Sequence, residues 1–377
     1  MKSRSSMSTF AVFAVAALFA LGLAACGGDD DSSTSGGGGG GGDGGGGGGK
    51  TIALLLPETK TTRYEEKDRP LFTDKVKELC PDCEVFYQNA SQDPNKQQQQ
   101  AEAAITKGAS VLVLDAVDVS SVGPIVQHAN QKNIPVIAYD RLIPDQDIAF
   151  YVSFDNVKQG RVQAQTLVDK LGSGAKGKSI VMVNGAPTDP SAGDYKKGAH
   201  QVLDKSGLKI AKEFDTPDWS PDKAQTEMEQ SITALGKDGF VGAYSANDGM
   251  AGGIIAALKG AGIDPQSKPV TGGDSEAAAI QRILTGEQLS TIYLAIKQQA
   301  ETSAQLAVDA AHGKMDPDGL AKDKVDNGSK QVDSVLLSPI AVTKDNIQDT
   351  VIKDGFLTVD EICTGKYAAA CKEAGLQ

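Results

Sequence analysis

The residues best suited to chemistry are polar and aromatic side chains placed just after short apolar segments. The segment 134–138 leads into Tyr139, Asp140 and Arg141, which offer an aromatic ring, a hydrogen-bond acceptor and a planar array of donors. Other candidates follow other apolar segments in the same way: Arg63, Tyr64, Ser191, Trp219, Asn247, Asp248 and Asp274. Because open α/β sheets bind ligands at the carboxyl ends of their strands, this placement predicts a shared polar cleft.

Such a set of side chains suits a ligand with many hydroxyl groups. Each hydroxyl both donates and accepts a hydrogen bond, and carboxylates, amides and guanidinium groups can satisfy it. Trp219, the only tryptophan in the chain, could cover the apolar face of a sugar ring. In a closed, dry cleft an unpaired hydroxyl costs about 1–3 kcal/mol, which would make the site selective.

Each of these residues also has an ordinary structural interpretation. Asp140 and Arg141 could pair only with each other, and Tyr64 and Trp219 could belong to the core. Asn247 could serve only as the cap of the helix that follows it. The joint placement of the set after the strands favours a binding site over these separate explanations.

The elements that must position the site alternate between short apolar segments and helical patterns from Thr51 onward. The strands expected on this pattern are 52–56, 85–87, 111–114, 136–139, 150–152, 180–183, 208–211, 240–244, 270–272, 289–294 and 335–337. The helices expected are 64–79, 95–107, 122–132, 157–171, 194–205, 223–235, 249–259, 277–284 and 297–312. This alternation is typical of βαβ units and of a parallel sheet.

The predicted fold class is α/β, with two doubly wound parallel-sheet lobes joined by a hinge that the chain crosses several times. The expected crossings lie near Ser153, Tyr293 and Ser338. The N-terminal lobe would comprise residues 50–153 plus 294–337, and the C-terminal lobe and tail would comprise 154–293 plus 338–377. Hinged lobes of this kind close on ligands.

The first 25 residues have the pattern of a lipoprotein signal peptide. Lys2 and Arg4 precede an uncharged run at 10–24, which is shorter than the roughly 20 residues of a spanning helix. The run ends in Leu-Ala-Ala-Cys, which resembles the lipobox of bacterial lipoproteins, with Cys26 as the lipidated residue. The alternative is an ordinary secretory peptide cut just before Cys26, which would then be a spare thiol.

Residues 26–49 form a tract of mainly Gly, Ser and Asp that we expect to be a disordered tether after the lipidated cysteine. The formal net charge is −12, and it becomes −14 without residues 1–25, which hold two basic residues and no acidic one. This balance argues against nucleic acid, whose binding depends on cationic contacts to phosphates. We expect a monomer anchored to the outer face of the cell membrane.

Four further cysteines, Cys80, Cys83, Cys363 and Cys371, are expected to form structural disulfides, because an exported chain meets oxidising conditions. Local pairs are favoured, although the sequence leaves the connectivity open. A thioredoxin-like motif would open a helix after a strand, whereas the Cys80–Cys83 segment follows an expected helix and precedes an expected strand. A zinc site would need a second ligand pair, and Cys363 and Cys371 lack that spacing.

Other motifs carry no chemistry on this interpretation, and we predict no metal, no cofactor and no catalytic residue. Residues 172–179 fit the phosphate-binding loop pattern letter by letter, but they lie between an expected helix and a following strand, the reverse of the required order. His128, His200 and His312 lack metal-ligand spacing and are expected on helix faces. A G-x-S-x-G nucleophile elbow is absent from the sequence.

Four longer motifs carry a family resemblance: AYDRLI at 138–143, FYVSFDN at 150–156, SAND at 245–248 and DTVIKDGF at 349–356. Over about residues 50–356, the chain resembles the periplasmic sugar-binding proteins of ABC transporters, type I fold, and most the D-xylose-binding branch. The resemblance implies sugar contacts at Arg63, Tyr64, Asp140, Arg141, Trp219, Asn247 and Asp274. It also implies a non-enzymatic receptor that delivers a monosaccharide to an ABC transporter permease.

Two departures from the family pattern affect the expected ligand. Ser191 stands where the family usually carries an asparagine, and Leu294 stands where a lysine usually follows the tyrosine of the last crossing. Losing two polar partners leaves another pentose, a hexose or another polyol as alternatives to xylose.

Two other classes of function are alternatives to transport. A surface receptor that senses sugar and signals to a partner protein would need the same cleft, whereas a repressor would need a basic DNA-binding headpiece. An extracellular glycosidase could use the carboxylates of Asp140 and Asp274. Nothing in the sequence assigns one of them as the acid and the other as the nucleophile.

Overall fold

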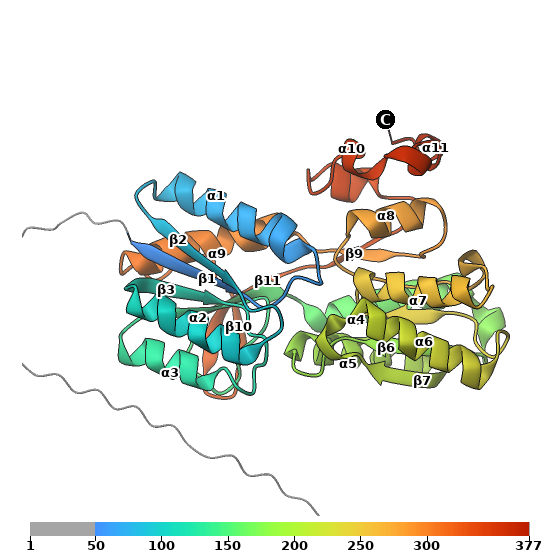
Figure 1. Ribbon diagram of the computed structural model, residues 1–377, viewed down its shortest axis with the longest axis horizontal. Helices are drawn as coiled ribbons and strands as arrows, with labels where there is room; N and C mark the ends of the chain where they lie inside the picture. The colour runs from blue at the N-terminus through green and yellow to red at the C-terminus, as the bar shows by residue number, and fades with distance from the viewer. Residues whose placement is uncertain (1–49, 377) are drawn as a thin grey trace, which may run out of the picture. The chain divides into compact units, whose positions relative to one another are not determined.

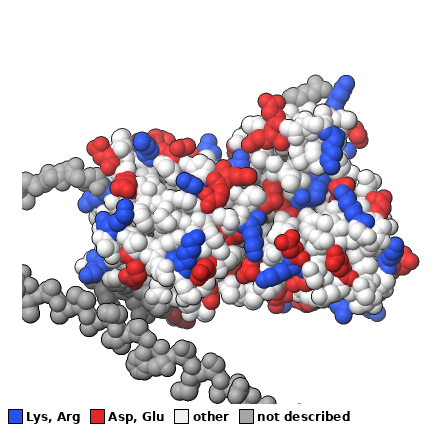
Figure 2. All heavy atoms as spheres, in the orientation of Figure 1, with Lys and Arg blue, Asp and Glu red and all other residues white. Residues whose placement is uncertain are grey.

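The computed structural model describes residues 50–376. The predicted signal peptide, the lipidation site at Cys26 and the glycine-rich tether lie outside the described residues. Within residues 50–376, every helix is too short or too polar to cross a membrane. Acidic and basic side chains are interspersed over the face of the molecule shown in Figure 2.

The first part of the chain builds a seven-stranded sheet, shown on the left of Figure 1. In spatial order its strands are β10 (Asp323–Asp326), β11 (Gln331–Leu337), β5 (Phe150–Phe154), β4 (Val136–Tyr139), β3 (Ala109–Leu114), β1 (Thr51–Leu56) and β2 (Glu84–Asn89). All neighbouring strands are parallel except β10 and β11. We refer to this sheet and its helices as the seven-stranded half.

Helices cover both faces of the seven-stranded sheet. Helices α1 (Arg69–Leu79) and α9 (Ile296–Ala311) pack on one face, and α2 (Pro94–Thr106) and α3 (Gly123–Gln131) pack on the other. In β1, Leu54 belongs to the first of the two cores, and its neighbour Leu55 belongs to the second. Because both faces of the central strands are buried, strands such as β1 and β3 read as continuous apolar runs.

The second part of the chain builds a smaller parallel sheet with the strand order β7 (Lys209–Asp215), β6 (Ser179–Asn184) and β8 (Ala243–Ser245). Its helices are α4 (Asn156–Leu171), α5 (Pro190–Ser206), α6 (Pro221–Leu235), α7 (Asp248–Gly260) and α8 (Ala277–Leu284). These elements enclose a separate hydrophobic core and form what we call the three-stranded half. The helices expected from the sequence are thus present, with ends that differ by a few residues.

The prediction of a strand at 270–272 is wrong. Only Val270 forms a β-bridge, and its partner is Ala243. The backbone of Val270 and Thr271 still hydrogen-bonds to Leu289 and Ala243. Beyond them the chain passes so close to Asp248 that a Cβ atom on Gly272 would lie 2.1 Å from its carboxylate. The segment therefore bends around Asp248 instead of extending the sheet.

Three connections join the halves. The chain leaves the seven-stranded sheet after β5, returns after β9 (Thr291–Tyr293), and leaves again after β11. Strand β12 (Ile340–Val342) then pairs antiparallel with β9. These connections lie at the crossings expected near Ser153, Tyr293 and Ser338, while the division of the chain into lobes at those residues stays a prediction.

The tail is held by an apolar cluster and a disulfide. Helices α10 (Val359–Ile362) and α11 (Ala368–Glu373) follow a π-helical turn at Gln348–Ile352, and Ile362 packs in one cluster with Ile280 of α8. Cys363 is bonded to Cys371, and Cys80 to Cys83, so the expectation of local disulfides is confirmed.

The glycine-rich segment 172–179 connects the end of α4 to the start of β6. It therefore lies at the amino edge of the strand and not before a helix, as predicted from the order of the elements. The phosphate-binding geometry, in which the first amides of a helix point at an anion, is not built by this segment.

Helices α4 and α5 pack with their backbones in direct contact at two glycines. A Cβ atom on Gly160 would lie 1.9 Å from the carbonyl oxygen of Tyr195, and one on Gly198 would lie 2.0 Å from that of Val157. Gly193, in the same helix α5, has open space at the Cβ position.

We therefore expect Gly198→Ala to lower the free energy of unfolding by about 1–3 kcal/mol, because the helices must move apart. The matched change Gly193→Ala should raise it by up to about 1 kcal/mol, because alanine favours a helix where nothing obstructs it. Urea unfolding followed by circular dichroism measures both, and equal effects of the two substitutions would contradict the packing described.

Candidate functional site

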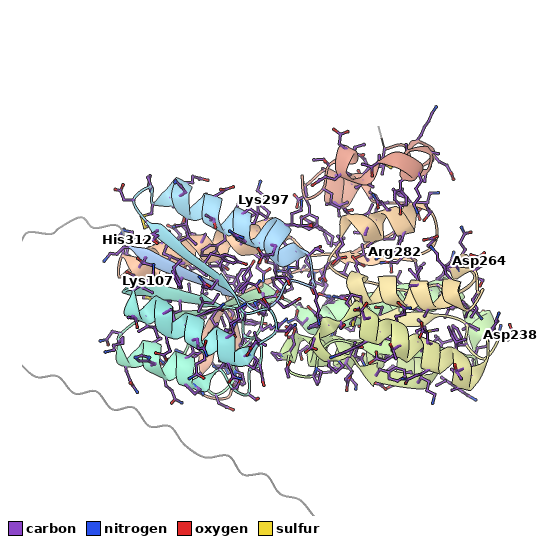
Figure 3. The ribbon with its side chains drawn as sticks, viewed as in Figure 1. Lys107, Asp238, Asp264, Arg282, Lys297 and His312 are labelled. Atoms are coloured by element: carbon purple, nitrogen blue, oxygen red, sulfur yellow. A yellow bond between two sulfur atoms is a disulfide. The ribbon has the colours of Figure 1, made fainter. Side chains whose placement is uncertain are left out.

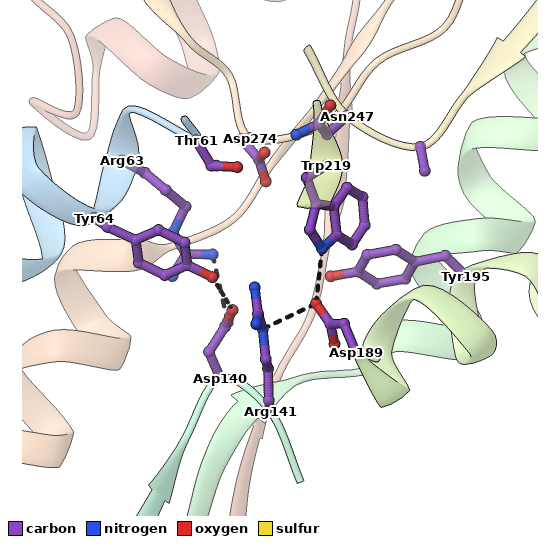
Figure 4. A pocket seen from close by; sticks show the side chains of 11 residues that line it. Thr61, Arg63, Tyr64, Asp140, Arg141, Asp189, Tyr195, Trp219, Asn247 and Asp274 are labelled. Carbon is purple, nitrogen blue, oxygen red and sulfur yellow. Dashed lines mark hydrogen bonds and ion pairs between the residues drawn. The ribbon is translucent and has the colours of Figure 1, made fainter. Parts of the chain in front are cut away.

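A pocket of about 330 Å³, part of it open to solvent, lies between the two halves. Side chains from both halves line it, as Figure 4 shows. The seven-stranded half contributes Thr61, Arg63, Tyr64, Asp140 and Arg141. The three-stranded half contributes Asp189, Tyr195, Trp219, Ala246, Asn247 and Asp274.

The lining residues come from the carboxyl ends of parallel strands in both sheets. Asp140 directly follows β4, and Thr61 lies in the loop after β1. In the other half, Trp219 follows β7 and Asn247 follows β8. The topology therefore brings these residues to facing edges, as expected for ligand sites in α/β sheets.

Asp140 is bound by three neighbours. Its carboxylate accepts hydrogen bonds from Tyr64 Oη at 3.1 Å and Gln299 Nε2 at 3.0 Å, and it lies 3.4 Å from Arg63 Nη1. Burial alone would raise the pKa of the Asp140 carboxyl, but the charge of Arg63 and these hydrogen bonds hold it below its ordinary value. Asp140 is therefore a fixed, ionised group, and it does not pair with Arg141.

Arg63 is held by a two-pronged ion pair. Its Nε and Nη2 atoms donate to Asp68 at 3.0 and 2.7 Å, and Nη2 also donates to Gln299 Oε1 at 2.7 Å. The five-residue turn Tyr64–Asp68 is π-helical, and it buries both Tyr64 and Asp68. Tyr139 donates a further hydrogen bond to Asp68. The wide turn thus places an aromatic side chain and an acidic one on the same inner side.

Arg141 connects the two halves at the pocket. Its guanidinium is buried, with Nε 3.0 Å from Asp189 Oδ2 and 3.3 Å from Asp115 Oδ1, and Nη1 donates to the Ala116 carbonyl at 2.8 Å. Asp189 also accepts the indole N–H of Trp219 at 3.1 Å. Asp189 is thus the common partner of a cation from one half and an aromatic ring from the other.

Three polar groups on the opposite wall have no hydrogen-bond partner among residues 50–376: the carboxylate of Asp274, the amide nitrogen of Asn247 and the hydroxyl of Tyr195. Asn247 uses its Oδ1 atom to cap α7, accepting from the Met250 N–H at 3.0 Å, so its NH₂ group is left for the pocket. Burial raises the pKa of the Asp274 carboxyl well above its ordinary value. Tyr195 lies edge-on to Trp219, with ring centroids 6.3 Å apart.

The pocket is lined by all of the predicted ligand residues except Ser191. Its hydroxyl accepts from Asn156 Nδ2 at 3.2 Å and lines a neighbouring cavity beside Tyr151. Ser191 is the second residue of α5, and the helix turns its side chain away from the pocket while Asp189, the cap before it, faces inward. Leu294 is buried in the apolar cluster of the tail.

Asp248, which follows Asn247 in the sequence, lies behind the pocket wall and does not line it. It is fully buried and accepts hydrogen bonds from Gln288 and Thr291, each at 2.7 Å. Burial and the neighbouring charge of Glu276 raise the pKa of this carboxyl to about 7. Its role is to support the segment that carries Asp274.

Sequence reasoning missed several residues of the site. Asp189 and Tyr195 line the pocket, while Asp68 and Gln299 hold Arg63 and Asp140 from behind. The Asp-Pro-Ser pattern at 189–191 is a helix-start signal that could have drawn attention to Asp189. Gln299 lies on α9, and no local signal connects that helix to the residues after β4.

Comparison with known proteins identifies the family. Residues 52–315 match the family described as the periplasmic binding protein domain. The chain belongs to this family. The predicted α/β fold class, the type I form with parallel sheets, is therefore confirmed, and the family is one of binding proteins and not of enzymes.

The periplasmic binding protein domain is shared with curated relatives over most of their length. The chain is 36% identical over 315 residues to the D-xylose-binding periplasmic protein of Escherichia coli (strain K12), covering 82% of this chain and 92% of the relative. It is 35% identical over 330 residues to the multiple sugar-binding periplasmic receptor of Rhizobium radiobacter, covering 83% and 92%.

A solved structure shows the same architecture. The ABC transporter solute-binding protein of Clostridium phytofermentans, with bound β-D-glucose, superposes with a TM-score of 0.74 at 27% sequence identity. The alignment covers 83% of this chain and all of that protein.

The position of Trp219 depends on a glycine beneath it. A Cβ atom on Gly185 would lie 2.0 Å from Cη2 and 2.3 Å from Cζ2 of the indole. We expect Gly185→Ala to displace the ring and lengthen its hydrogen bond to Asp189, so that the emission of this single tryptophan shifts to longer wavelength. Gly193→Ala is the control, and an unchanged emission spectrum of folded Gly185→Ala would contradict the contact.

Proposed function

We propose that this protein captures a neutral monosaccharide between its two halves, as an extracytoplasmic receptor for an ABC transporter permease. The observation that carries the proposal is that two kinds of polar group meet in one pocket. Some already have hydrogen-bond partners in the protein, and others have none within the described part of the chain. The paired groups, Arg63 and Asp140, form a rigid wall. The groups without partners among residues 50–376, the Asp274 carboxylate and the Asn247 NH₂ group, are the ones that a ligand must satisfy.

The balance of donors and acceptors supports a polyhydroxy ligand. Asp274 offers only acceptors when ionised, Asn247 offers the donors of its NH₂ group, and the Tyr195 hydroxyl offers both. A ring with vicinal hydroxyls can donate hydrogen bonds to the Asp274 carboxylate and accept them from the Asn247 NH₂ group. An acidic sugar would bring a second negative charge close to Asp274, whose carboxylate has no cation bonded to it within residues 50–376.

The aromatic wall supports a ring-shaped ligand. Trp219 is held at its indole nitrogen by Asp189 and at its edge by Tyr195, so its orientation is fixed before any ligand arrives. A flat, immobile indole suits the apolar C–H face of a pyranose or furanose ring. Pre-ordering of this kind reduces the entropy lost on binding.

For the identity of the sugar, we propose a xylose-like pentose or a related sugar. The relatives' names include both a D-xylose-binding and a multiple sugar-binding protein. In this chain Ser191 faces away from the pocket and Leu294 is buried among apolar side chains. Neither residue supplies the polar partner usual in the family, which favours acceptance of more than one sugar.

The cellular setting is part of the same proposal. The lipobox-like segment before Cys26 supports a lipid anchor on the outer face of the membrane, from which a monomeric receptor would deliver its sugar to the permease. A sugar-sensing receptor coupled to a signalling partner is the second candidate, and it is favoured by the word receptor in the name of one relative. Uptake of labelled sugar in cells lacking the permease separates the two candidates. Transport predicts that uptake is lost, and sensing alone predicts that it continues.

Titration calorimetry with a panel of pentoses, hexoses, polyols and uronic acids tests the proposal directly. At least one neutral sugar should bind with a dissociation constant in the micromolar range or below, about −8 kcal/mol or stronger. Uronic acids should bind far more weakly. Binding of no neutral sugar tighter than about 1 mM, roughly −4 kcal/mol, would overturn the proposal.

Asp274→Asn should separate binding from stability. We expect affinity for the best sugar to fall by about 10- to 100-fold, because a charge-assisted acceptor becomes a neutral amide. The folded-state pKa of Asp274 is raised above its unfolded value, so ionising it costs stability as pH rises above about 4. The substitution removes that cost and should raise the free energy of unfolding at pH 7.

The control for this prediction is Asp238→Asn, on the same half but exposed and distant from the pocket (Figure 3). It should change neither affinity nor stability by a measurable amount. Loss of affinity together with lower stability in Asp274→Asn would show that the residue supports the fold and does not hold the ligand.

Binding should also release protons. Hydroxyl donors favour the ionised carboxylate, so the bound sugar lowers the pKa of Asp274 from its raised free-state value. At a pH between the two values, binding expels a proton, and affinity decreases as pH falls below the free-state pKa. Calorimetry in two buffers with different ionisation enthalpies should give different apparent heats for the native protein and equal heats for Asp274→Asn. Equal heats for both proteins across the range from pH 4 to 8 would contradict this linkage.

A further inference from the structure

Two cysteines and a histidine meet at the end of the seven-stranded half that lies away from the pocket. Cys80 ends α1, Cys83 immediately precedes β2, and His312 immediately follows α9. A sulfur atom from each cysteine and a ring nitrogen of His312 all lie within 4.8 Å of one another. Figure 3 labels His312 at this outer end of the ribbon, whereas the pocket is at the opposite, carboxyl end of the strands.

The packing of two helices creates this cluster. Helices α1 and α9 cover the same face of the sheet, and both cysteines pack against the apolar cluster that contains Ala310 and Ala311. The two helices therefore end beside each other, although they are far apart in the sequence. The histidine is exposed and the two cysteines are partly exposed, so solutes can reach the cluster.

His312 is oriented by a backbone hydrogen bond. Its Nδ1 atom lies 2.8 Å from the carbonyl oxygen of Val308, which can only accept, so Nδ1 carries the hydrogen and donates it. The lone pair of the neutral ring is then on Nε2. A metal-binding histidine is typically held in this way, with one nitrogen donating to a carbonyl and the other facing the ion.

We propose that, once the Cys80–Cys83 disulfide is reduced, the two thiolates and His312 bind a thiophilic divalent cation such as Zn²⁺. Zinc bonds of about 2.3 Å to sulfur and about 2.0–2.1 Å to nitrogen place ligand atoms roughly 3.5–3.8 Å apart in a tetrahedral site. In the oxidised chain these three atoms all lie within 4.8 Å of one another, so binding requires the imidazole to approach the sulfurs and the two sulfurs to separate when their bond opens. Water completes the fourth position.

The chemistry of the switch is balanced with a phosphine as the reductant. The phosphine gives two electrons to the sulfur–sulfur bond and takes an oxygen atom from water, whose two hydrogens appear on the two thiols. The metal ion then displaces these two protons and binds the thiolates. The oxidised pair has no thiolate to offer, so disulfide and metal are alternative states of the same residues.

The second disulfide of the chain is an internal comparison. Cys363 and Cys371 are also close together, but no histidine or carboxylate completes a three-residue cluster with them among residues 50–376. A thiol pair alone should hold a divalent cation less tightly than a pair with a preoriented imidazole. The inference therefore assigns the metal to one pair and not to the other.

Cobalt is the probe of choice, because Co²⁺ replaces Zn²⁺ and is coloured. The experiment uses the mature chain with Cys26→Ser in every variant, which removes the one cysteine outside the two disulfides. After reduction, we expect one Co²⁺ per chain, with thiolate-to-cobalt charge-transfer bands and the intense visible bands of a tetrahedral ion. Added Zn²⁺ should bleach them, and the oxidised protein should show none.

Four variants locate the site. Cys80→Ser/Cys83→Ser should abolish the bands, whereas Cys363→Ser/Cys371→Ser should keep them. His312→Gln should weaken Co²⁺ binding at least 10-fold and change the band shape, while His128→Gln, at a partly exposed histidine on another helix, should have no effect. Circular dichroism spectra of each reduced variant are compared with that of the reduced parent. A folding defect changes the spectrum, whereas the loss of a metal-coordinating side chain does not.

Several results would overturn the proposal. These are a reduced parent protein without the bands, bands that persist in folded Cys80→Ser/Cys83→Ser, or bands whose shape and affinity are unchanged in His312→Gln. Bands of equal strength in the oxidised protein would exclude a thiolate site altogether. Because sugar binding plays no part in this test, its outcome is independent of the proposed function.

Discussion

The ion pair between Arg141 and Asp189 is the contact on which the geometry of the pocket depends. The arginine comes from the loop after β4 and the aspartate from the cap of α5, so the pair joins the two halves. Both side chains are almost fully buried. A buried ion pair gains little net stability, because desolvation offsets the attraction, but separating it in place would leave two uncompensated charges. Such a pair is best understood as fixing a geometry.

Several other features follow from the position of Asp189. The same carboxylate accepts the indole N–H of Trp219 and the first free amide of α5, at Ser191. Tyr195 lies one turn further along that helix and packs edge-on against the indole. One guanidinium from the opposite half thus helps to orient the aromatic wall of the pocket. Opening of the halves would expose Arg141 and Asp189 to water, which lowers the cost of parting them.

The sequence predicted the architecture well, for identifiable physical reasons. The central strands of the seven-stranded half are buried on both faces, so their apolar runs are unambiguous, as in β1 and β3. The edge strand β10 is mostly exposed and charged, and the sequence did not predict it. The rule that ligand sites gather at the carboxyl ends of strands correctly placed Arg63, Asp140, Trp219 and Asn247 in one pocket. That rule depends only on topology, which the alternation of strands and helices determines.

The failures have physical causes as well. The strand-end rule does not specify the rotation of the following helix, so Ser191 was expected in the pocket that Asp189 lines instead. Gln299 and His312 reach their neighbours through packing between segments distant in the sequence, which local patterns do not report. Asp140 and Asp274 occupy left-handed backbone conformations, with φ of 63° and 93°, which are uncommon for these residues and are typical of strained functional positions.

The two walls of the pocket differ in a way that bears on how ligand preference can change. On the seven-stranded side, Arg63 and Asp140 are held by Asp68, Gln299 and each other, so altering either one disturbs an entire buried network. On the other side, the carboxylate of Asp274 and the hydroxyl of Tyr195 make no hydrogen bond within residues 50–376, so a change there leaves no protein group unpaired. Asp274 and Tyr195 can therefore vary at low cost to the fold, while Arg63 and Asp140, under the proposed function, would set the position of the sugar ring. A family that keeps one architecture and binds different sugars would be expected to divide its site in this way, because selectivity then resides in groups whose only partner is the ligand.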